Sequence, residues 1–182
     1  MSIIKISVIT ITYNAENVIM RTLDSVLKQT FSNIEHIIID GASKDSTLFA
    51  EKEYESRSCS TNNGHEIKII SEPDKGLYDA MNKGIGKATG NYLVFLNAGD
   101  VFPSSSTLET VADMIGDGEE LPGVLFGDTN IVDDNGNFLR HRRLSPPAHL
   151  NWRSFMFGML VCHQAFYART DIAKRNYYDL HY

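Results

Sequence analysis

The short apolar stretch Tyr92–Leu96, followed at once by the polar tetrapeptide Asn97-Ala98-Gly99-Asp100, constrains the fold more than any other feature of the chain. A short run of β-branched and aromatic residues is typical of a strand that is buried on both faces. Open α/β sheets contain such strands and place ligand-binding groups at their carboxyl ends. Gly99 permits a tight turn there, and Asp100 offers a hard oxygen ligand. Taken alone, the tetrapeptide is better explained as a turn in which Asp100 binds nearby backbone amides.

Strands and helices alternate along the first half of the chain, which predicts a parallel sheet covered by helices. Apolar runs predict strands at Lys5–Thr12, Ile34–Ile39, Ile67–Ile70, Tyr92–Leu96, Gly123–Gly127 and Cys162–Arg169. Helices are expected after a cap at Asn14, after Asp45 or Ser46, over Leu77–Ala88, and from a capping box at Ser106–Glu109 to Ile115. A hairpin turn is expected at Asp133–Asn137 and a polar surface loop at Ser58–Gly64. The expected class is α/β, with a mostly parallel but mixed sheet.

Two more predicted strands end in small polar groups, Thr12-Tyr13-Asn14 and Asp40-Gly41. If these strands are parallel neighbours of Tyr92–Leu96, all three ends meet at one edge of the sheet, where a ligand is expected. There Asp40 could accept a hydrogen bond from a base imide, and Tyr13 could stack on the base. Asp100 could hold a divalent cation on a diphosphate. The structural alternatives are a strand-end turn for Asp40 and a core ring for Tyr13.

The signatures of several other classes do not occur. No Gly-x-Gly-x-x-Gly follows the first strand and no Gly-Lys-Ser/Thr loop is present, which weakens dinucleotide-binding and NTPase interpretations. A formal net charge of −6 does not favour a nucleic-acid partner. The two cysteines fit a reducing compartment, and neither a secretory signal nor a bilayer-spanning run is evident. We therefore expect a cytoplasmic protein.

Four sequence blocks occur in one order along the chain. They are Ser7–Asn14, Ile38–Thr47, Gly76–Ile85 and Ala88–Asp100. As an ordered set they resemble the large family 2 of inverting glycosyltransferases, which has the GT-A fold, a three-layer sandwich. The resemblance covers residues 4–128 well and is weaker to residue 169. Any one of the blocks alone would not be specific.

The resemblance implies a nucleotide-sugar donor, usually linked to UDP. Asp40 matches the residue that binds the uracil edge. The residues expected to line the base pocket are Thr12, Tyr13 and Asn14. The residues expected near the donor ribose and phosphates are Asp79, Asn82 and Lys83. A solvated Asp79 and a surface Lys83 are the structural alternatives.

The resemblance also implies Mg²⁺ or Mn²⁺ on the diphosphate. Asp100 matches the last carboxylate of the metal motif, but the usual Asp-x-Asp-Asp is Asn97-Ala98-Gly99-Asp100 here, so two customary carboxylates are missing. His163-Gln164 matches a pair near the acceptor, although a buried structural histidine is an equal alternative. The family's catalytic base is an Asp in an acidic motif after that pair, and we expect it beyond Tyr182.

We accordingly expect one GT-A domain over residues 1–182. Residues 1–128 would form the nucleotide-sugar-binding half, and residues 129–182 would begin an acceptor-side half whose carboxyl-terminal part is missing. The leading hypothesis is an inverting hexosyltransferase that moves a sugar, with a UDP-sugar as the favoured donor, to a glycan or lipid-linked acceptor. Such a truncated piece would bind the donor and transfer sugar poorly. The alternatives are a non-catalytic module that binds nucleotide sugars, or a nucleotidyltransferase, although Ile11–Ala15 lacks the Gly-rich basic loop of that class.

Two further segments bear on partners. The basic run His141-Arg142-Arg143 fits a lipid diphosphate or an anionic membrane, with a solvated charge run as the alternative. Four apolar residues fit a membrane or acceptor contact, with core or homo-oligomer packing as the alternative: Trp152, Phe155, Met156 and Phe157. Peripheral contact with the inner face of the plasma membrane is therefore left open.

Overall fold

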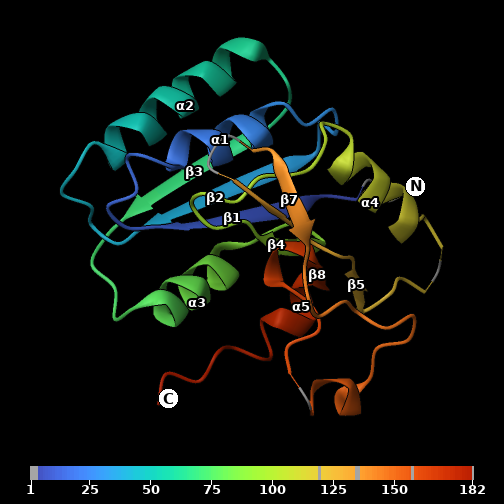
Figure 1. The fold of residues 1–182 in the computed structure, drawn as a ribbon. Helices are drawn as coiled ribbons and strands as arrows, with labels where there is room; N and C mark the ends of the chain where they lie inside the picture. The colour runs from blue at the N-terminus through green and yellow to red at the C-terminus, as the bar shows by residue number, and fades with distance from the viewer. Residues whose placement is uncertain (1–3, 119, 134–135, 157, 182) are drawn as a thin grey trace.

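The protein is a three-layer α/β structure built around a six-stranded mixed sheet with strand order β3-β2-β1-β4-β8-β5 (Figure 1). The structure is a computed structural model that describes residues 4–118, 120–133, 136–156 and 158–181. The parallel strands are β1 (Ile6–Thr12), β2 (Ile34–Asp40), β3 (Glu66–Ser71) and β4 (Tyr92–Phe95). Two strands run antiparallel at the far side, β8 (Phe166–Arg169) against β4, and β5 (Val124–Phe126) against β8. The expected α/β class with a mostly parallel, mixed sheet is confirmed.

Helices cover both faces of the sheet. The helices of one face are α1 (Ile19–Leu27), α2 (Thr47–Thr61) and α4 (Thr107–Ile115), and those of the other are α3 (Leu77–Lys87) and the short α5 (Thr170–Ala173). The remaining elements are the hairpin strands β6 (Asn130–Val132) and β7 (Phe138–His141) and the 3₁₀ turns η1 (Trp152–Phe155) and η2 (His163–Ala165). No helix within the described part of the chain is both long enough and apolar enough to cross a bilayer.

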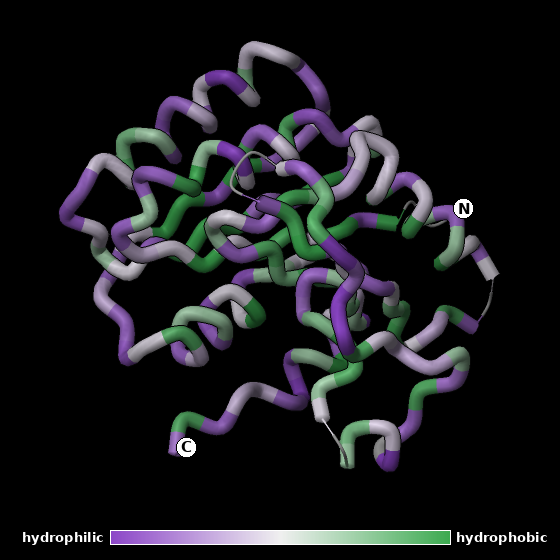
Figure 2. Tube along the Cα trace, viewed as in Figure 1, coloured by the Kyte–Doolittle hydropathy of each residue, from purple (hydrophilic) through white to green (hydrophobic). Residues whose placement is uncertain are grey.

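Alternating side chains of the central strand β1 point into the hydrophobic cores on the two sides of the sheet. Ile6 and Val8 pack with α1 and α4, whereas Ile9 and Ile11 pack with α3. Both faces of β1 are buried, because successive side chains of a strand point to opposite faces and helices cover each of them. In the tube coloured by hydropathy, the hydrophobic residues accordingly concentrate in the sheet, whereas hydrophilic and hydrophobic residues alternate along the helices (Figure 2).

A buried carboxylate fixes the relative positions of the parallel strands. Glu35 in β2 is fully buried and accepts hydrogen bonds from Ser7 of β1 (2.7 Å) and from the backbone (2.8 Å) and hydroxyl (2.7 Å) of Thr89, just before β4. Lys68 of β3 forms an ion pair with it. Burial alone would raise the pKa of Glu35, but the bonds from Lys68, Thr89 and Ser7 outweigh burial and lower the pKa to about 2.

Several sequence-based boundaries are wrong. The expected loop at Ser58–Gly64 is helical as far as Thr61, because Tyr54 and Ser58 extend the buried stripe of α2. Asn14 does not cap α1, which begins only at Ile19. The strand expected over Cys162–Arg169 begins at Phe166, because η2 takes up its first part.

The capping box expected at Ser106 is also wrong, because Ser106 makes no side-chain cap and Glu109 instead accepts a hydrogen bond from Thr30 (2.8 Å). Of the two residues expected to cap α2, Ser46 stands at the N-cap position but makes no side-chain cap bond, whereas the carboxylate of Asp45, one residue earlier, accepts the backbone N–H of Thr47 at 3.0 Å. The hairpin expected around Asp133–Asn137 forms between β6 and β7, although residues 134–135 lie outside the described residues.

Glu51 of α2 provides a test of this packing. Its side chain is fully buried, and neither carboxyl oxygen has a hydrogen-bond partner within the described residues. Burial raises the pKa of Glu51 to about 8, and the carboxylates of Asp40 and Asp45 add to this effect. The carboxyl group is therefore protonated in the folded protein at neutral pH.

Because folding raises this pKa from an ordinary value of 4.5, the native state binds an extra proton between about pH 4.5 and pH 8. We expect the Glu51 contribution to stability to be complete at low pH and to fall by up to about 1.4 kcal/mol per pH unit across that window. Glu51→Gln should flatten the pH dependence of the free energy of unfolding measured with urea. Glu53→Gln, at an exposed site on the same helix, is the matched control and should leave the slope unchanged.

Candidate functional site

The carboxyl ends of three parallel strands lie side by side at one edge of the sheet. The backbone N–H of Gly41, just after β2, donates to the carbonyl of Thr12 in β1 at 2.9 Å. On the other side of β1, the N–H of Ala98 donates to the carbonyl of Ile11 at 3.2 Å. The expected convergence of the three polar strand ends is therefore present in the fold.

Tyr13 forms an aromatic shelf at this edge. Its side chain is 60% exposed, so the residue does not belong to the core. A methyl group on Gly41 would lie 3.2 Å from the ring of Tyr13 and 2.7 Å from a carboxyl oxygen of Asp74. The ring and Asp74 approach the backbone this closely only because residue 41 is glycine. Asp74 was not identified from the sequence as a site residue.

Asp40 ends β2, opposite Thr12 of β1, and is fully buried. One of its carboxyl oxygens accepts the hydroxyl of Ser71 at 2.5 Å, and both accept the backbone N–H of Ser43 at 3.1 and 3.2 Å. The hydroxyl of Ser43 also donates to the carboxylate. Neither serine was predicted from the sequence to contact Asp40. Ser43 stands three residues after Asp40, the spacing of a local side-chain turn, whereas Ser71 comes from β3 and only the sheet brings it close.

The neighbours of Tyr13 have different roles in the structure. Thr12 is buried, and its hydroxyl has no hydrogen-bond partner in the described part of the chain. Asn14 adopts a left-handed conformation with φ of 46°. Its backbone N–H donates to the Ser43 hydroxyl at 2.8 Å and its amide oxygen accepts the Lys44 N–H at 2.9 Å. Asn14 therefore fixes the loop that surrounds Asp40.

The polar turn Asn97–Asp100 after β4, termed here the β4 tip, is hydrogen-bonded to η2. Asp100 accepts a hydrogen bond from the side chain of Gln164 at 2.8 Å, and the amide nitrogen of Asn97 lies 3.1 Å from Nε2 of His163. Since that amide nitrogen can only donate, His163 accepts through Nε2 and carries its proton on Nδ1. Burial lowers the pKa of His163, and Asp100 acts in the opposite direction. The residues expected at the metal and on the acceptor side are thus in direct contact.

Helix α1 also forms hydrogen bonds with the β4 tip. The hydroxyl of Thr22 accepts the N–H of Gly99 at 2.8 Å, and the guanidinium of Arg21 donates to the carbonyl of Gly99. Gly99 has a φ of 99°, a value that other residues rarely adopt. Arg21 and Thr22 were not identified from the sequence, because an interior helix position gives no local sign of a bond to a loop 77 residues away.

The oxygen atoms at this tip suit a hard divalent cation. Besides Asp100, the side-chain oxygens of Asn97 and Gln164 are buried and have no hydrogen-bond partner among the described residues. Mg²⁺ and Mn²⁺ take carboxylate and amide oxygens as ligands. Within the described residues, no group of three His, Cys, Asp or Glu side chains could hold a metal ion. A cation here would therefore depend on further oxygens from a bound ligand.

Two of the three expected residues of α3 face each other near the same edge. Asp79 accepts the backbone N–H of Lys75 at 3.0 Å and lies 3.6 Å from the ammonium of Lys83. Lys83 also contacts Glu72 at 3.0 Å and donates to the carbonyl of Pro73 at 2.8 Å. Partial burial acts to lower the pKa of Lys83, but the carboxylates of Glu72, Asp79 and Asp74 together outweigh it and the pKa is raised. Lys83 is thus an ion-paired side chain at the loop after β3.

Asn82, the third, is occupied by the carboxyl-terminal segment. Its side-chain amide accepts the backbone N–H of Tyr178 at 2.8 Å and donates to the carbonyl of the same residue at 2.9 Å. The Tyr178 ring stacks on Tyr78 with centroids 5.1 Å apart and meets Phe95 edge-on at 6.3 Å. Tyr178 also lines an apolar cavity of about 250 Å³ that has His163 in its wall.

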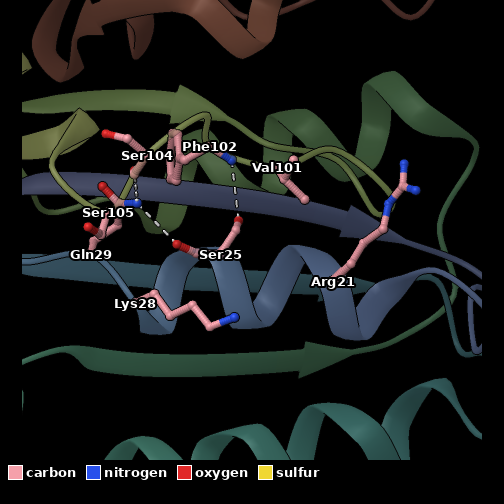
Figure 3. Close-up of a pocket in the computed structure, with 8 residues that line it drawn as sticks. All are labelled: Arg21, Ser25, Lys28, Gln29, Val101, Phe102, Ser104 and Ser105. Carbon is pink, nitrogen blue, oxygen red and sulfur yellow. Dashed lines mark hydrogen bonds between the residues drawn. The ribbon is translucent and has the colours of Figure 1, made fainter. Parts of the chain in front are cut away.

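A second cavity, of about 260 Å³, lies between α1 and the segment after the β4 tip (Figure 3). Its polar groups are mainly engaged in holding these parts together. The side chain of Gln29 donates to the carbonyl of Ser104 at 2.7 Å, and the hydroxyl of Ser25 accepts the N–H of Phe102 at 3.4 Å. The guanidinium of Arg21 lies at one end of the lining residues and the ammonium of Lys28 lies below Ser25 (Figure 3). We assign it a structural role.

The family model described as "Glycosyl transferase family 2" matches residues 7–175. The chain belongs to this family. The PGL/p-HBAD biosynthesis glycosyltransferase of Mycobacterium bovis (strain BCG / Pasteur 1173P2) is 34% identical over 177 residues, which are 97% of this chain and 64% of that protein. The amylovoran biosynthesis glycosyltransferase AmsB of Erwinia amylovora is 31% identical over 177 residues, 94% of this chain and 56% of that protein. The chain therefore spans less than two thirds of the length of these relatives.

Solved structures of other transferases share the fold. TarS 1-349 of S. aureus, in complex with UDP-GlcNAc, has a TM-score of 0.69 and 24% identity over 96% of this chain and 48% of that chain. The mannosyltransferase PcManGT of Pyrobaculum calidifontis, in complex with GDP-Man and Mn²⁺, has a TM-score of 0.56 and 26% identity over 68% of this chain and 35% of that chain. The GT-A fold expected from the four ordered blocks is confirmed, and the nucleotidyltransferase alternative is not favoured.

The position of Asn82 leads to a direct prediction. Asn82→Ala removes both hydrogen bonds to Tyr178 and should release the segment around residues 177–181. At about 0.5–1.5 kcal/mol per bond, amide hydrogen exchange at Tyr178 should become roughly tenfold faster. Hydrogen–deuterium exchange read by mass spectrometry measures this change. Lys87→Ala, at the exposed far end of α3, is the control, and equal exchange in the two variants would contradict the assignment.

Proposed function

We propose that this chain is the donor-binding part of an inverting glycosyltransferase that takes its sugar from a nucleotide diphosphate, with UDP as the favoured nucleotide. The observation that carries the proposal is the placement of an exposed aromatic ring, a buried carboxylate and an oxygen-rich tip along one edge of the sheet: Tyr13, Asp40 and Asp100. The complexes of TarS with UDP-GlcNAc and of PcManGT with GDP-Man support a nucleotide-sugar donor.

The base is proposed to stack on Tyr13 and to present its imide edge toward Asp40. In the free protein the Ser71 hydroxyl donates to a carboxylate oxygen of Asp40. On binding, the imide N–H would replace this hydroxyl, so the carboxylate exchanges one donor for another and is never left unpaired. Thr12 and Asn14 would complete the base pocket, Asn14 by holding the loop that carries Ser43.

The sugar-diphosphate end is proposed to lie between α3 and the β4 tip. Asp79 would accept a ribose hydroxyl, and Lys83 would supply positive charge near the phosphates. Asn82 is proposed to act through Tyr178, whose backbone it holds against the helix. Asp100 would hold Mg²⁺ or Mn²⁺, with the free oxygens of Asn97 and Gln164 close by. When bound, the cation would neutralise charge on the departing diphosphate.

On the acceptor side, the neutral imidazole of His163 and the amide of Gln164 would line the path of the attacking hydroxyl. Gln164 would also orient Asp100 through its hydrogen bond. Inversion requires the hydroxyl to attack from the side opposite the diphosphate while a base removes its proton, and base assistance is worth about 10²–10⁴-fold in rate. We propose that this base is the family's acidic residue beyond Tyr182, so residues 1–182 would bind the donor and transfer the sugar, to a glycan or lipid-linked acceptor, only slowly.

The aromatic shelf gives the first test. Tyr13→Ala should weaken UDP binding measured by isothermal titration calorimetry by about fivefold or more, because stacking of a base on an aromatic ring is worth about 1–3 kcal/mol. Thermal stability should change little, since the ring is mostly exposed. Phe49→Ala removes another exposed ring, on α2, and should leave the affinity for UDP unchanged. Equal affinities of the two variants would refute the base pocket.

The tip gives the second test. A ligand at one hundred times its dissociation constant should stabilise the chain by about 2.7 kcal/mol, which a thermal-shift assay detects. We expect Mn²⁺ to increase the shift produced by a UDP-sugar, and Asp100→Asn to abolish this increase while a shift by UDP without metal remains. Asp113→Asn, an exposed site on α4, is the control. If Asp100→Asn retains the full effect of Mn²⁺, the metal assignment is wrong.

A further inference from the structure

The segment formed by residues 138–160, termed here the basic arm, differs in charge from the rest of the chain. It contains four arginines and two histidines but no aspartate or glutamate, whereas the whole chain has a net charge of −6. In Figure 1 the orange arm runs from β7 to the 3₁₀ turn η1 at the bottom of the view, away from the layer of α1 and α2. Hydrophilic and hydrophobic residues are mixed along it (Figure 2).

The arm also exposes large apolar side chains. Four of them are between 55% and 65% exposed: Phe138, Leu139, Met156 and Met159. Leu144 and Phe155 are exposed to a smaller degree. Single exposed apolar residues are common on proteins, but several within one short basic segment indicate an interaction surface. Phe157 and the side chain of Trp152 lie outside the described residues.

Internal contacts give the arm a defined shape. The guanidinium of Arg142 donates to the carbonyls of Met159 at 2.7 Å and Leu160 at 3.1 Å, and so joins the two ends of the arm. Leu144 lies next to Gly158, where an added methyl group would be 3.3 Å from its side chain. The hydroxyl of Ser145 donates to Asp128 at 3.0 Å, which attaches the arm to the end of β5. The exposed methionines therefore belong to a closed, hydrogen-bonded loop.

The path of the chain connects the arm to the proposed site. After Leu160 the chain enters the fold at the buried Val161 and forms η2, which carries His163 and Gln164. Gln164 contacts Asp100 directly. A surface that binds the arm would consequently lie close to the acceptor side of the β4 tip.

We infer that the basic arm binds the surface of an anionic lipid bilayer, with arginines against the headgroups and the exposed Met156 and Met159 in the boundary with the acyl chains. Arginine attracts anionic lipid by roughly 1 kcal/mol per residue near the surface, and exposed apolar side chains add burial in the interface. A nucleic acid would use the arginines but not the aliphatic side chains. A second copy would bring two basic arms together, and their like charges would repel. Donor binding does not require this contact with a bilayer.

The test is co-sedimentation of the chain with lipid vesicles. We expect binding to vesicles with about one third phosphatidylglycerol, little binding to pure phosphatidylcholine, and a loss of binding as salt is raised, because exposed charges are screened. Equal binding to both kinds of vesicle would overturn the inference. UDP should not alter the vesicle affinity, and Tyr13→Ala should bind vesicles normally, so failure of the donor site and failure of the arm are distinguishable.

Paired variants separate charge from apolar contact. Arg140→Glu with Arg143→Glu should lower the partition coefficient at least about 25-fold, from about fivefold per arginine, whereas Lys52→Glu with Lys87→Glu elsewhere should change it less than about threefold. Met156→Ser with Met159→Ser should lower it about tenfold, and Phe49→Ser with Met114→Ser should not. If only the arginine variant loses binding, the arm is a simple polyanion site and the inference fails. If sedimentation in solution shows a dimer that the methionine variant abolishes, the arm is a self-association surface and the inference also fails.

Discussion

The buried carboxylate of Glu35 is the interaction on which the arrangement of the sheet depends. It accepts bonds from β1, from β3 and from the turn before β4, so one side chain of β2 sets the level of all three neighbouring segments. A buried charge is tolerated only when it is fully paired, and four donor groups satisfy this one. Because the parallel strands are held in register at their amino ends, their carboxyl ends lie side by side, and the polar residues after β1, β2 and β4 meet at one edge of the sheet.

At that edge, closely packed buried residues lie beside exposed ones. Asp40 is buried and accepts hydrogen bonds from hydroxyl and backbone donors, whereas the nearby Tyr13 side chain, one residue after the partner of Asp40 in β1, is exposed. Glycine at residue 41 permits the close approach of the ring and Asp74 to the backbone. The β4 tip is held from α1 by Thr22 and from η2 by Gln164, which come from opposite parts of the chain. The tip is thus positioned by both halves of the molecule, and the basic arm leads directly into one of them.

Much of the fold was predictable because the signals are local. Long apolar runs identify β1, β2 and β4, and the pattern of Ala80, Met81 and Ile85 identifies α3 within one residue at its end. The errors fall where tertiary contacts overrule local preference. Helix α2 continues into Ser58–Thr61 because Tyr54 and Ser58 pack against the fold, although the composition there is that of a loop. Likewise η2 replaces the start of a strand where His163 and Gln164 turn toward the β4 tip.

The sequence by itself determined the class of fold, the family and the strand ends at which polar residues gather, because hydrophobic period and motif order are properties of the chain. Only the tertiary structure decided which side chains meet. It placed Ser71 on Asp40, Gln164 on Asp100 and Tyr178 on Asn82, pairs that lie 31, 64 and 96 residues apart. Hydrogen bonds act over about 3 Å, so no local pattern records a partner that the packing of distant segments brings into reach.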